Sequence, residues 1–212
     1  MASVFLLTLF FFMSILELSS MIGFPMKKLL FDFKNNDNLA NWQELSDTVR
    51  DVGKSKAVFV TYNTKSKQSA LLLTMLMVQE NGAGFCGIRT ITQLNLEKYE
   101  KLSFTCIPNG NATHYKVVLR HNNENDEPYP AFEQQFEVKL NSENNIELPL
   151  MKFKPYFRGK LVDNVTLNTS SITAFGFQVA GGVYESFKQS GLSSLELDQI
   201  WAILKSSNTI IS

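Results

Sequence analysis

Short apolar runs rich in β-branched and aromatic residues recur along the chain, and polar turns separate them. The runs lie at residues 29–33, 57–62, 69–78, 84–90, 102–107, 115–120, 132–138, 146–148, 172–179 and 195–203. No segment shows a long 3.6-residue period of apolar positions. Many short strands with turns every ~8–12 residues are typical of a β-sandwich. The sequence therefore predicts an all-β fold in a single domain.

One run leaves its secondary structure open. Residues 69–78 (SALLLTMLMV) are apolar almost without interruption, which fits either a strand buried on both faces or a helix. Turn-like sequence precedes this run at 65–68 and follows it at 80–84. These flanks favour a strand.

Composition limits the classes of partner and site. The chain has 212 residues, with 20 Lys+Arg and 20 Asp+Glu, so its formal net charge is zero. This balance argues against a broad electrostatic surface for nucleic acid or anionic lipid. A chain with 44% hydrophobic and 19% charged residues is suited to a packed domain. Two His and two Cys leave little room for a metal cage, and we predict no metal and no cofactor.

The N-terminal segment has the features of a secretory signal. Residues 4–16 are apolar except for Thr8 and Ser14, and the run is shorter than the ~20 residues that span a bilayer. Small residues follow it, as at a cleavage region. We predict a signal peptide over residues 1–23, no stable membrane span after its cleavage, and a protein of the secretory pathway or the extracellular space. An uncleaved anchor and a mitochondrial location are the alternatives, although the first cation is Lys27 and an import presequence is Arg-rich.

Three sequons support the secretory interpretation. Asn111, Asn164 and Asn168 each begin an N-x-[ST] motif in polar, turn-like sequence. Such motifs also arise by chance, so their weight is joint. We expect at least one of them to carry an N-linked glycan.

The two cysteines allow two interpretations. Cys86 and Cys106 both fall in predicted strands, and neighbouring strands would bring them together. In an oxidising compartment such a pair is a candidate disulfide. The alternative is two free buried thiols that behave as small hydrophobic residues.

No pattern of catalytic residues stands out. His114 and His121 are seven residues apart, which places them on opposite faces of a strand, and surface histidines are the favoured interpretation. The chain has no Gly-x-Ser-x-Gly elbow, no phosphate loop and no Cys or His at metal-ligand spacing. A glycosidase pair among the many carboxylates stays open. We predict no catalytic residue and a protein that is not an enzyme.

Each of two acidic segments could be either a solvated surface or a site that binds an ion or a ligand. Residues 122–127 (NNENDE) could bind Ca²⁺ through oxygen ligands, but a solvated turn is favoured. Glu196 and Asp198 alternate with Leu195 and Leu197, so the carboxylates share one face of a strand. An outward polar face is favoured there over a face that binds a ligand or an ion.

Several strings, in this order, resemble one family. They are 46–55 (SDTVRDVGKS) after Trp42, 84–90 (GFCGIRT), 99–104 (YEKLSF), 146–159 (IELPLMKFKPYFRG), 172–177 (ITAFGF) and 191–200 (GLSSLELDQI). Together they resemble the complex I intermediate-associated protein 30 (CIA30) domain family. The resemblance gives a domain over residues 29–204 and a C-terminal tail over 205–212. Residues 180–190 (AGGVYESFKQS) depart from the family pattern, which has a short polar link there.

The resemblance implies a fold and a class of function. The fold would be a jelly-roll β-sandwich of the galactose-binding-domain-like type, similar to some carbohydrate-binding modules. Mitochondrial members assist assembly of respiratory complex I as chaperone-like factors, and the family supplies no catalytic residues to carry over. Gly176, between Phe175 and Phe177, would allow tight packing on the sheet, and Pro155 and Gly159 would fix a turn.

Three hypotheses about function follow. The first is a non-catalytic protein that binds or escorts a protein client in the secretory pathway. The second is a mitochondrial complex I assembly factor with atypical targeting. The third is a secreted carbohydrate-binding module that holds a glycan on exposed aromatic residues such as Tyr129, Phe132 and Tyr184.

Overall fold

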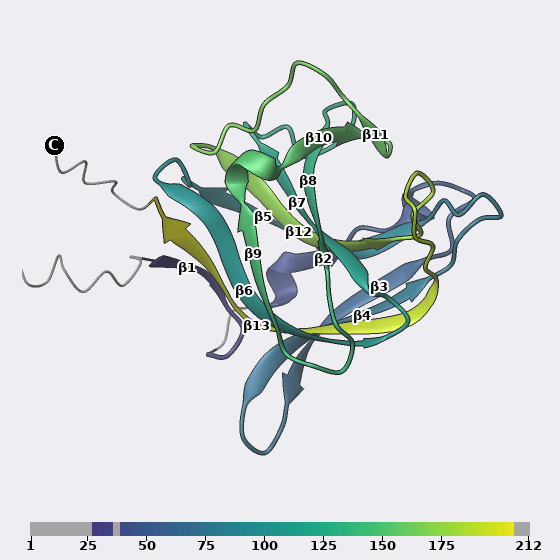
Figure 1. The fold of residues 1–212 in the computed structure, drawn as a ribbon, viewed down its shortest axis with the longest axis horizontal. Helices are drawn as coiled ribbons and strands as arrows, with labels where there is room; N and C mark the ends of the chain where they lie inside the picture. Colours follow the sequence, from purple (N-terminus) through teal and green to yellow (C-terminus); the bar gives the residue numbers. More distant parts are fainter. Residues whose placement is uncertain (1–26, 36–38, 206–212) are drawn as a thin grey trace, which may run out of the picture. The chain divides into compact units, whose positions relative to one another are not determined.

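Two antiparallel β-sheets pack face to face and enclose the apolar core (Figure 1). The computed structural model describes residues 27–35 and 39–205, which belong to one compact unit, Lys27–Lys205. Within these residues there are strands and three short 3-10 helices but no α-helix. The elements are β1 (Lys27–Asp32), η1 (Leu39–Asn41), β2 (Trp42–Glu44), η2 (Asp47–Val49), β3 (Lys56–Asn63), β4 (Gln68–Leu76), β5 (Phe85–Leu94), β6 (Tyr99–Gly110), β7 (His114–His121), β8 (Ala131–Glu137), β9 (Asn144–Pro149), η3 (Leu150–Lys152), β10 (Lys154–Phe157), β11 (Lys160–Leu161), β12 (Ile172–Ala180) and β13 (Gly191–Leu204). The predicted jelly-roll β-sandwich is confirmed.

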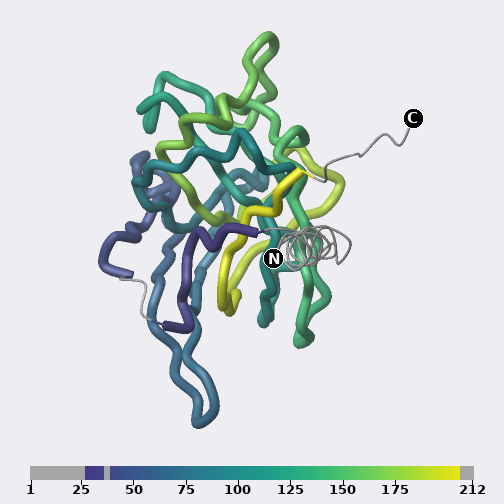
Figure 2. The backbone as a smooth tube through the Cα atoms, turned by 90° about the vertical axis from the view of Figure 1, so that its left-hand side faces the viewer, coloured from purple at the N-terminus to yellow at the C-terminus, as the bar shows by residue number. Residues whose placement is uncertain are grey.

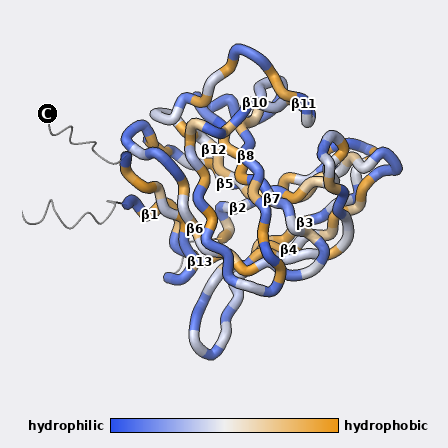
Figure 3. The backbone as a smooth tube through the Cα atoms, in the orientation of Figure 1, coloured by the Kyte–Doolittle hydropathy of each residue, from blue (hydrophilic) through white to orange (hydrophobic). Residues whose placement is uncertain are grey.

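Strands that are distant in sequence lie side by side in each sheet. The first sheet has the order β3-β4-β13-β6-β9, and β1 pairs with the C-terminal part of β13. The second sheet has the order β11-β10-β8-β7-β12-β5-β2. The late strands β12 and β13 thus occupy the interior of the two sheets. The hairpin between β3 and β4 extends beyond the rest of the first sheet in two views at right angles (Figures 1 and 2), and its tip is hydrophilic (Figure 3).

The core consists of side chains that alternate inward along the strands. One aromatic cluster joins Phe33, Trp42 and Phe59, with ring centroids 5.3–5.7 Å apart. A second joins Phe104 to Phe136 and Phe177, each at 5.4 Å with nearly perpendicular rings. Edge-to-face contacts of this kind add to the stability that burial of the rings provides. The aromatic residues in the predicted strands therefore serve mainly to hold the two sheets together.

Residues 69–78 form a strand, as predicted, but only one of its faces is buried. In β4 the side chains of Ala70, Leu72 and Leu76 are buried, whereas Leu73 and Met75 are exposed. A continuous apolar run can therefore supply an outer face as well as a core.

The two cysteines lie on strands of different sheets. Cys86 is in β5 of the second sheet and Cys106 is in β6 of the first, and both thiols are free and buried. Burial in the apolar core raises the pKa of each thiol to about 12. Of the two interpretations, the structure shows the free buried thiols.

Two further expectations were wrong because their residues are in the interior. His121 is buried at the end of β7, where its Nδ1 accepts a hydrogen bond from the backbone N–H of Asn168 at 2.7 Å. Phe132 is fully buried and packs against His121, so it is not a surface platform.

The predicted signal peptide over residues 1–23 and the tail beyond Lys205 lie outside the described residues. Of the helices in the described part of the chain, none is long and apolar enough to cross a membrane.

Candidate binding surfaces

The outer face of the second sheet is hollow because its inner strands carry small residues there. Gly176 of β12 lies between Val118 of β7 and Arg89 of β5 in the strand register. A Cβ atom at Gly176 would lie 2.5 Å from the carbonyl oxygen of Ile88, so no larger residue fits without movement. This confirms the tight packing predicted at Gly176. Above this floor lie two adjoining cavities of about 300 and 570 Å³, which we call the cleft.

A loop held by a buried carboxylate forms one wall of the cleft. Asp47 accepts hydrogen bonds from the backbone N–H and the hydroxyl of Ser55, at 2.9 and 2.8 Å, and from the N–H of Phe85 at 3.3 Å. A Cβ atom at Gly53 would lie 2.0 Å from the carbonyl oxygen of Asp47. Residues 46–55, which carry part of the family resemblance, are therefore structural, and they place Arg50 at the cleft.

Every arginine of the chain lines the larger cavity, and three of the four form ion pairs. Arg50 and Arg158 share the carboxylate of Glu127, at 3.2 and 2.6 Å. Arg89 binds Asp126 at 2.7 Å. Residues 122–127 therefore direct carboxylates to arginines, which disfavours the Ca²⁺ interpretation. The hydrogen bonds from Arg158 and Arg50 lower the pKa of Glu127.

The fourth arginine, Arg120, is held differently. Its Nη1 donates hydrogen bonds to the backbone carbonyls of Glu124 at 3.3 Å and Tyr129 at 3.1 Å. Among the described residues no carboxylate forms an ion pair with it. Burial lowers the pKa of the half-buried guanidinium and the neighbouring charge of Arg89 adds to the shift, whereas the carboxylates of Asp126, Glu133 and Glu127 oppose it. Arg120 is thus a cation in the cleft with carboxylates nearby but none in direct contact among the described residues.

A turn after β10 directs Arg158 toward Glu127. Arg158 and Gly159 have φ angles of 51° and 77°, the left-handed conformation of a tight hairpin between β10 and β11. Pro155, which was expected in this turn, lies within β10 instead.

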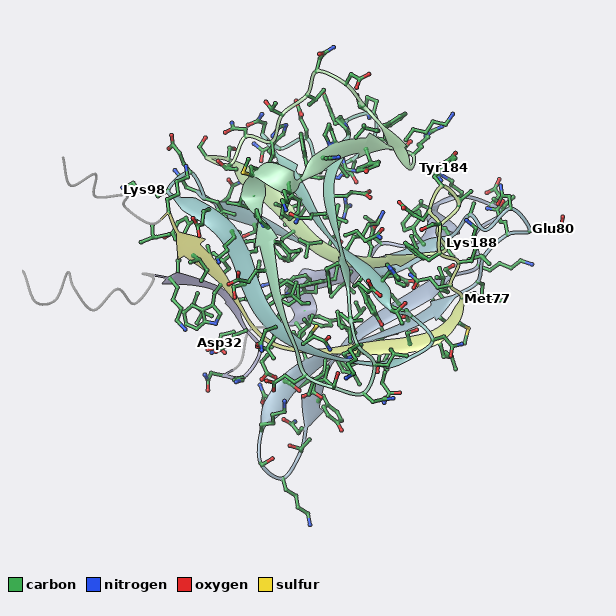
Figure 4. The ribbon with its side chains drawn as sticks, viewed as in Figure 1. Asp32, Met77, Glu80, Lys98, Tyr184 and Lys188 are labelled. Carbon is green, nitrogen blue, oxygen red and sulfur yellow. The ribbon has the colours of Figure 1, made fainter. Side chains whose placement is uncertain are left out.

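The segment 180–190 forms the opposite wall. The Gln189 side chain donates to the carbonyls of His114 and Ala180, at 2.7 and 2.9 Å, so it ties this loop to β7 and β12. The ring of His114 stacks on Phe187 with centroids 3.8 Å apart. Figure 4 shows Tyr184 and Lys188 on this loop, and Tyr184 is exposed. The departure from the family pattern therefore builds part of the cleft.

Exposed aromatic residues and a central ion pair complete the cleft. Tyr129 and Tyr184 are exposed at its rim, as predicted, and Tyr156 is half-buried within it. Lys116 and Glu133 form an ion pair of 2.5 Å on the floor. Sequence reasoning did not identify the arginines or this pair, because nothing in the local sequence indicates that these positions converge.

The outer face of the first sheet is apolar instead. Its exposed and half-buried side chains lie in adjoining rows of the register between β3, β4 and β13. They are Val58, Val60, Leu71, Leu73, Met75 and Leu192, which we call the apolar face. A shallow groove of about 530 Å³ runs over part of it and continues to Asn109 and Ser194.

Charged residues border the apolar face on one side. Glu196 and Asp198 share a face of β13 while Leu195 and Leu197 are buried, as predicted. Lys67 binds both carboxylates, at 2.7 and 3.4 Å, and its hydrogen bond to Glu196 raises the pKa of Lys67. The carboxylates thus form the favoured outward polar face.

The three sequon asparagines are all exposed and outside the regular strands. The backbone N–H of Asn111 binds the carbonyl of Leu192 at 3.0 Å, so Asn111 borders the apolar face. The side chain of Asn168 donates to Asn122 at 2.9 Å. Their glycosylation stays a prediction.

Comparisons with known proteins identify a matching family model and solved structures of similar fold. The model of the Complex I intermediate-associated protein 30 (CIA30) family matches residues 31–197. Among solved structures, the family 11 carbohydrate-binding module from Clostridium thermocellum, in complex with a β-1,3-1,4-mixed-linked tetrasaccharide, has a TM-score of 0.60 at 16% identity over 84% of this chain and 95% of that chain. A family 30 carbohydrate-binding module has a TM-score of 0.54 at 10% identity over 87% of this chain and 91% of that chain. At these identities the likeness concerns the fold. A search of curated protein sequences gave no match.

Proposed function

The chain belongs to the CIA30 family, and from this we propose that it is a non-catalytic β-sandwich protein that binds and escorts other proteins, in the secretory pathway or outside the cell. The family is named for association with an intermediate of complex I. The observation that carries the proposal is the apolar face, because a client in an incomplete state of assembly exposes apolar surface that needs a partner.

The composition of the apolar face suits a client of variable shape. Leu73, Met75 and Leu192 are 43%, 44% and 63% exposed, which is unusual for three large apolar residues in adjacent strands. Methionine adapts its flexible side chain to different partners and is common on surfaces that bind more than one. Lys56 and Lys67 border the face and favour its solubility in the absence of a client.

Suppression of aggregation tests the escort role. We expect the protein to slow light scattering by an unfolding reporter protein, and the double variant Leu73→Ser, Met75→Ser to lose most of this effect. Met151→Ser is the matched control, because Met151 is 90% exposed outside the apolar face. If the double variant remained as effective as the wild type, the apolar face would not be the client surface.

The cellular location is a separate part of the proposal. The apolar N-terminal segment and the three sequons support a secretory route. A C-terminally tagged protein should appear in the secretory pathway or the medium and shift in mobility after removal of N-glycans. Accumulation in the mitochondrial matrix would favour the complex I alternative.

A second candidate function, glycan binding, is favoured by the cleft. Its small floor residues, polar side chains and rim tyrosines provide the hydrogen-bonding groups and aromatic surfaces that saccharide binding requires. Titration with a panel of oligosaccharides tests it. We expect Tyr184→Ala to weaken binding and Tyr62→Ala, an exposed tyrosine on β3, to leave it unchanged. If no saccharide bound, this candidate would be discarded.

A further inference from the structure

The distribution of cationic residues is uneven between the cleft and the rest of the chain. The sequence has four arginines, Arg50, Arg89, Arg120 and Arg158, and all four line the larger cavity. Of its sixteen lysines only Lys116 lines it. Arginine presents a planar fork of donors that matches carboxylate and sulfate oxygens, whereas lysine is a point charge. We propose that the cleft binds an acidic saccharide whose carboxylate or sulfate group lies between Arg89 and Arg120. This rests on the second candidate function, that the cleft holds a glycan.

The charges of the cleft are not balanced within it. Five cationic side chains line the larger cavity against the three carboxylates of Asp126, Glu127 and Glu133, and the smaller cavity adds one carboxylate, that of Glu185. Glu127 serves two arginines at once. The surplus is local, because the whole chain has no net charge. In a partly enclosed site of reduced dielectric, such a surplus favours an anion more strongly than the same charges would in open solvent.

Arg120 is the residue at which the anion is needed most. Two backbone carbonyls accept hydrogen bonds from its Nη1, and the described residues provide no carboxylate as a direct partner. A partly buried charge without an ionic partner is unfavourable. An oxyanion that accepted hydrogen bonds from the remaining donors of Arg120 would supply that partner.

The strand register leaves room for such a group. Arg89 is opposite Gly176 in β12, and Arg120 is opposite Ala174 in the same strand, so the two guanidinium groups flank a strand with small residues. Arg89 donates a hydrogen bond to the carbonyl of Asn125 and Arg120 to that of Glu124, so both guanidinium groups reach adjacent residues of one loop. An oxyanion between them would bind one guanidinium on each side.

The surroundings favour a saccharide over an acidic peptide. Val118 and Tyr156 line the same cavity, and Tyr129, whose carbonyl accepts a hydrogen bond from Arg120, is 47% exposed. Apolar and aromatic surfaces beside a charged group suit a ring with one apolar face and one acidic substituent. The cleft lies on the face of the sheet, whereas an extended peptide commonly adds to a sheet edge through main-chain hydrogen bonds.

Calorimetric titration with three saccharides and one peptide tests the proposal. The probes are tetragalacturonate, a sulfated heparin-derived tetrasaccharide and the neutral cellotetraose, with tetraglutamate as the peptide comparison. We expect at least one acidic saccharide to bind about tenfold or more tightly than cellotetraose at low salt, and the difference to shrink at high salt. Arg120→Gln should reduce acidic-saccharide affinity about tenfold or more and leave binding of the neutral one nearly unchanged.

A second variant and a control separate binding from folding. Arg89→Gln should lower the affinity for the acidic saccharide in the same way, should Arg120→Gln fail to fold. Lys101→Gln removes a cation paired to Glu147 on the first sheet and should change nothing. Binding of cellotetraose as tightly as the acidic probes would overturn this inference but leave glycan binding intact. Binding of no saccharide would overturn both, and equal binding of tetraglutamate would overturn the saccharide assignment.

Discussion

The two outer faces of the sandwich follow the same strand geometry but offer opposite surfaces. On the first sheet, outward positions of β3, β4 and β13 carry Val, Leu and Met, which form a flat apolar face. On the second sheet, outward positions of β5, β7 and β12 carry glycine, alanine and charged residues, which form a hollow cleft. The difference shows that binding chemistry here is decided by outward residues, because the inward ones in both sheets serve one shared core.

Loops strengthen the contrast. The cleft is bounded by residues 46–55, 122–130 and 181–189, and these loops shield the outward positions of β12. The apolar face has no comparable cover among the described residues, and its outward side chains in β4 remain exposed. One face therefore fits a ligand that enters a cavity, and the other fits a partner with a broad apolar surface.

The largest expected effect is at Asp47, whose hydrogen bonds connect the two sheets. Asp47 follows β2 of the second sheet and binds Ser55, whose hydroxyl accepts a hydrogen bond from Met77 at the end of β4. Asp47→Ala would leave buried donors of Ser55 and Phe85 without acceptors, so we expect about 3 kcal/mol lower free energy of unfolding. Urea denaturation measures it. Asp51→Ala, which removes an exposed carboxylate of the same loop, is the control. An equal loss of stability there would contradict a stabilising role for the hydrogen bonds of Asp47.

The next effect distinguishes the hollow face from the flat one. Gly176→Val would place side-chain atoms against the carbonyl of Ile88, and we expect it to cost about 2–3 kcal/mol of stability and to fill the cleft. Ser194→Val lies beside Leu73 on the apolar face and should change stability by no more than about 0.5 kcal/mol. Thermal unfolding of both variants makes the comparison. Similar losses at the two sites would contradict the account of a close-packed floor.

Sequence reasoning reached the strands but not the surfaces. The short apolar runs between polar turns predicted nearly every long strand, because burial constrains local sequence. The arginines, by contrast, are distributed over residues 50–158; pairing of β5 and β7 with β12 brings Arg89 and Arg120 together, and the loop 46–55 and the turn after β10 add Arg50 and Arg158. The sequence signals for the cleft were Gly176, the exposed tyrosines Tyr129 and Tyr184, and the unusual segment 180–190. For a related reason the sequence could not decide between a disulfide and two free thiols, because the placement of Cys86 and Cys106 depends on which strands are neighbours.

A smaller effect should appear on acidification. Burial lowers the pKa of His121 below 6.5, while the carboxylate of Glu124 opposes the shift. The neutral form is thus favoured in the folded state, so its contribution to stability is full above pH 6.5 and is lost as pH falls through the lowered pKa. We expect a modest decrease in the free energy of unfolding between pH 8 and pH 5. Denaturation at pH 8 and pH 5 should show a smaller decrease in the free energy of unfolding for His121→Asn than for the wild type. An equal decrease would exclude His121 as the group responsible.

The smallest effect uses the two thiols as reporters of the two sheets. Cys86 lies beneath the cleft in β5 and Cys106 lies in β6 of the first sheet, and burial raises the pKa of each to about 12. Alkylation at pH 8 therefore requires local opening of the sheet that carries the thiol. In the single-cysteine variants Cys106→Ala and Cys86→Ala, mass spectrometry gives each rate separately. A ligand in the cleft should slow alkylation of Cys86 severalfold and that of Cys106 much less, because it bridges β5 and β7 but contacts no strand of the first sheet. Equal slowing of alkylation at both thiols would show that the two sheets open together, so that their outer faces differ in surface chemistry but not in local stability.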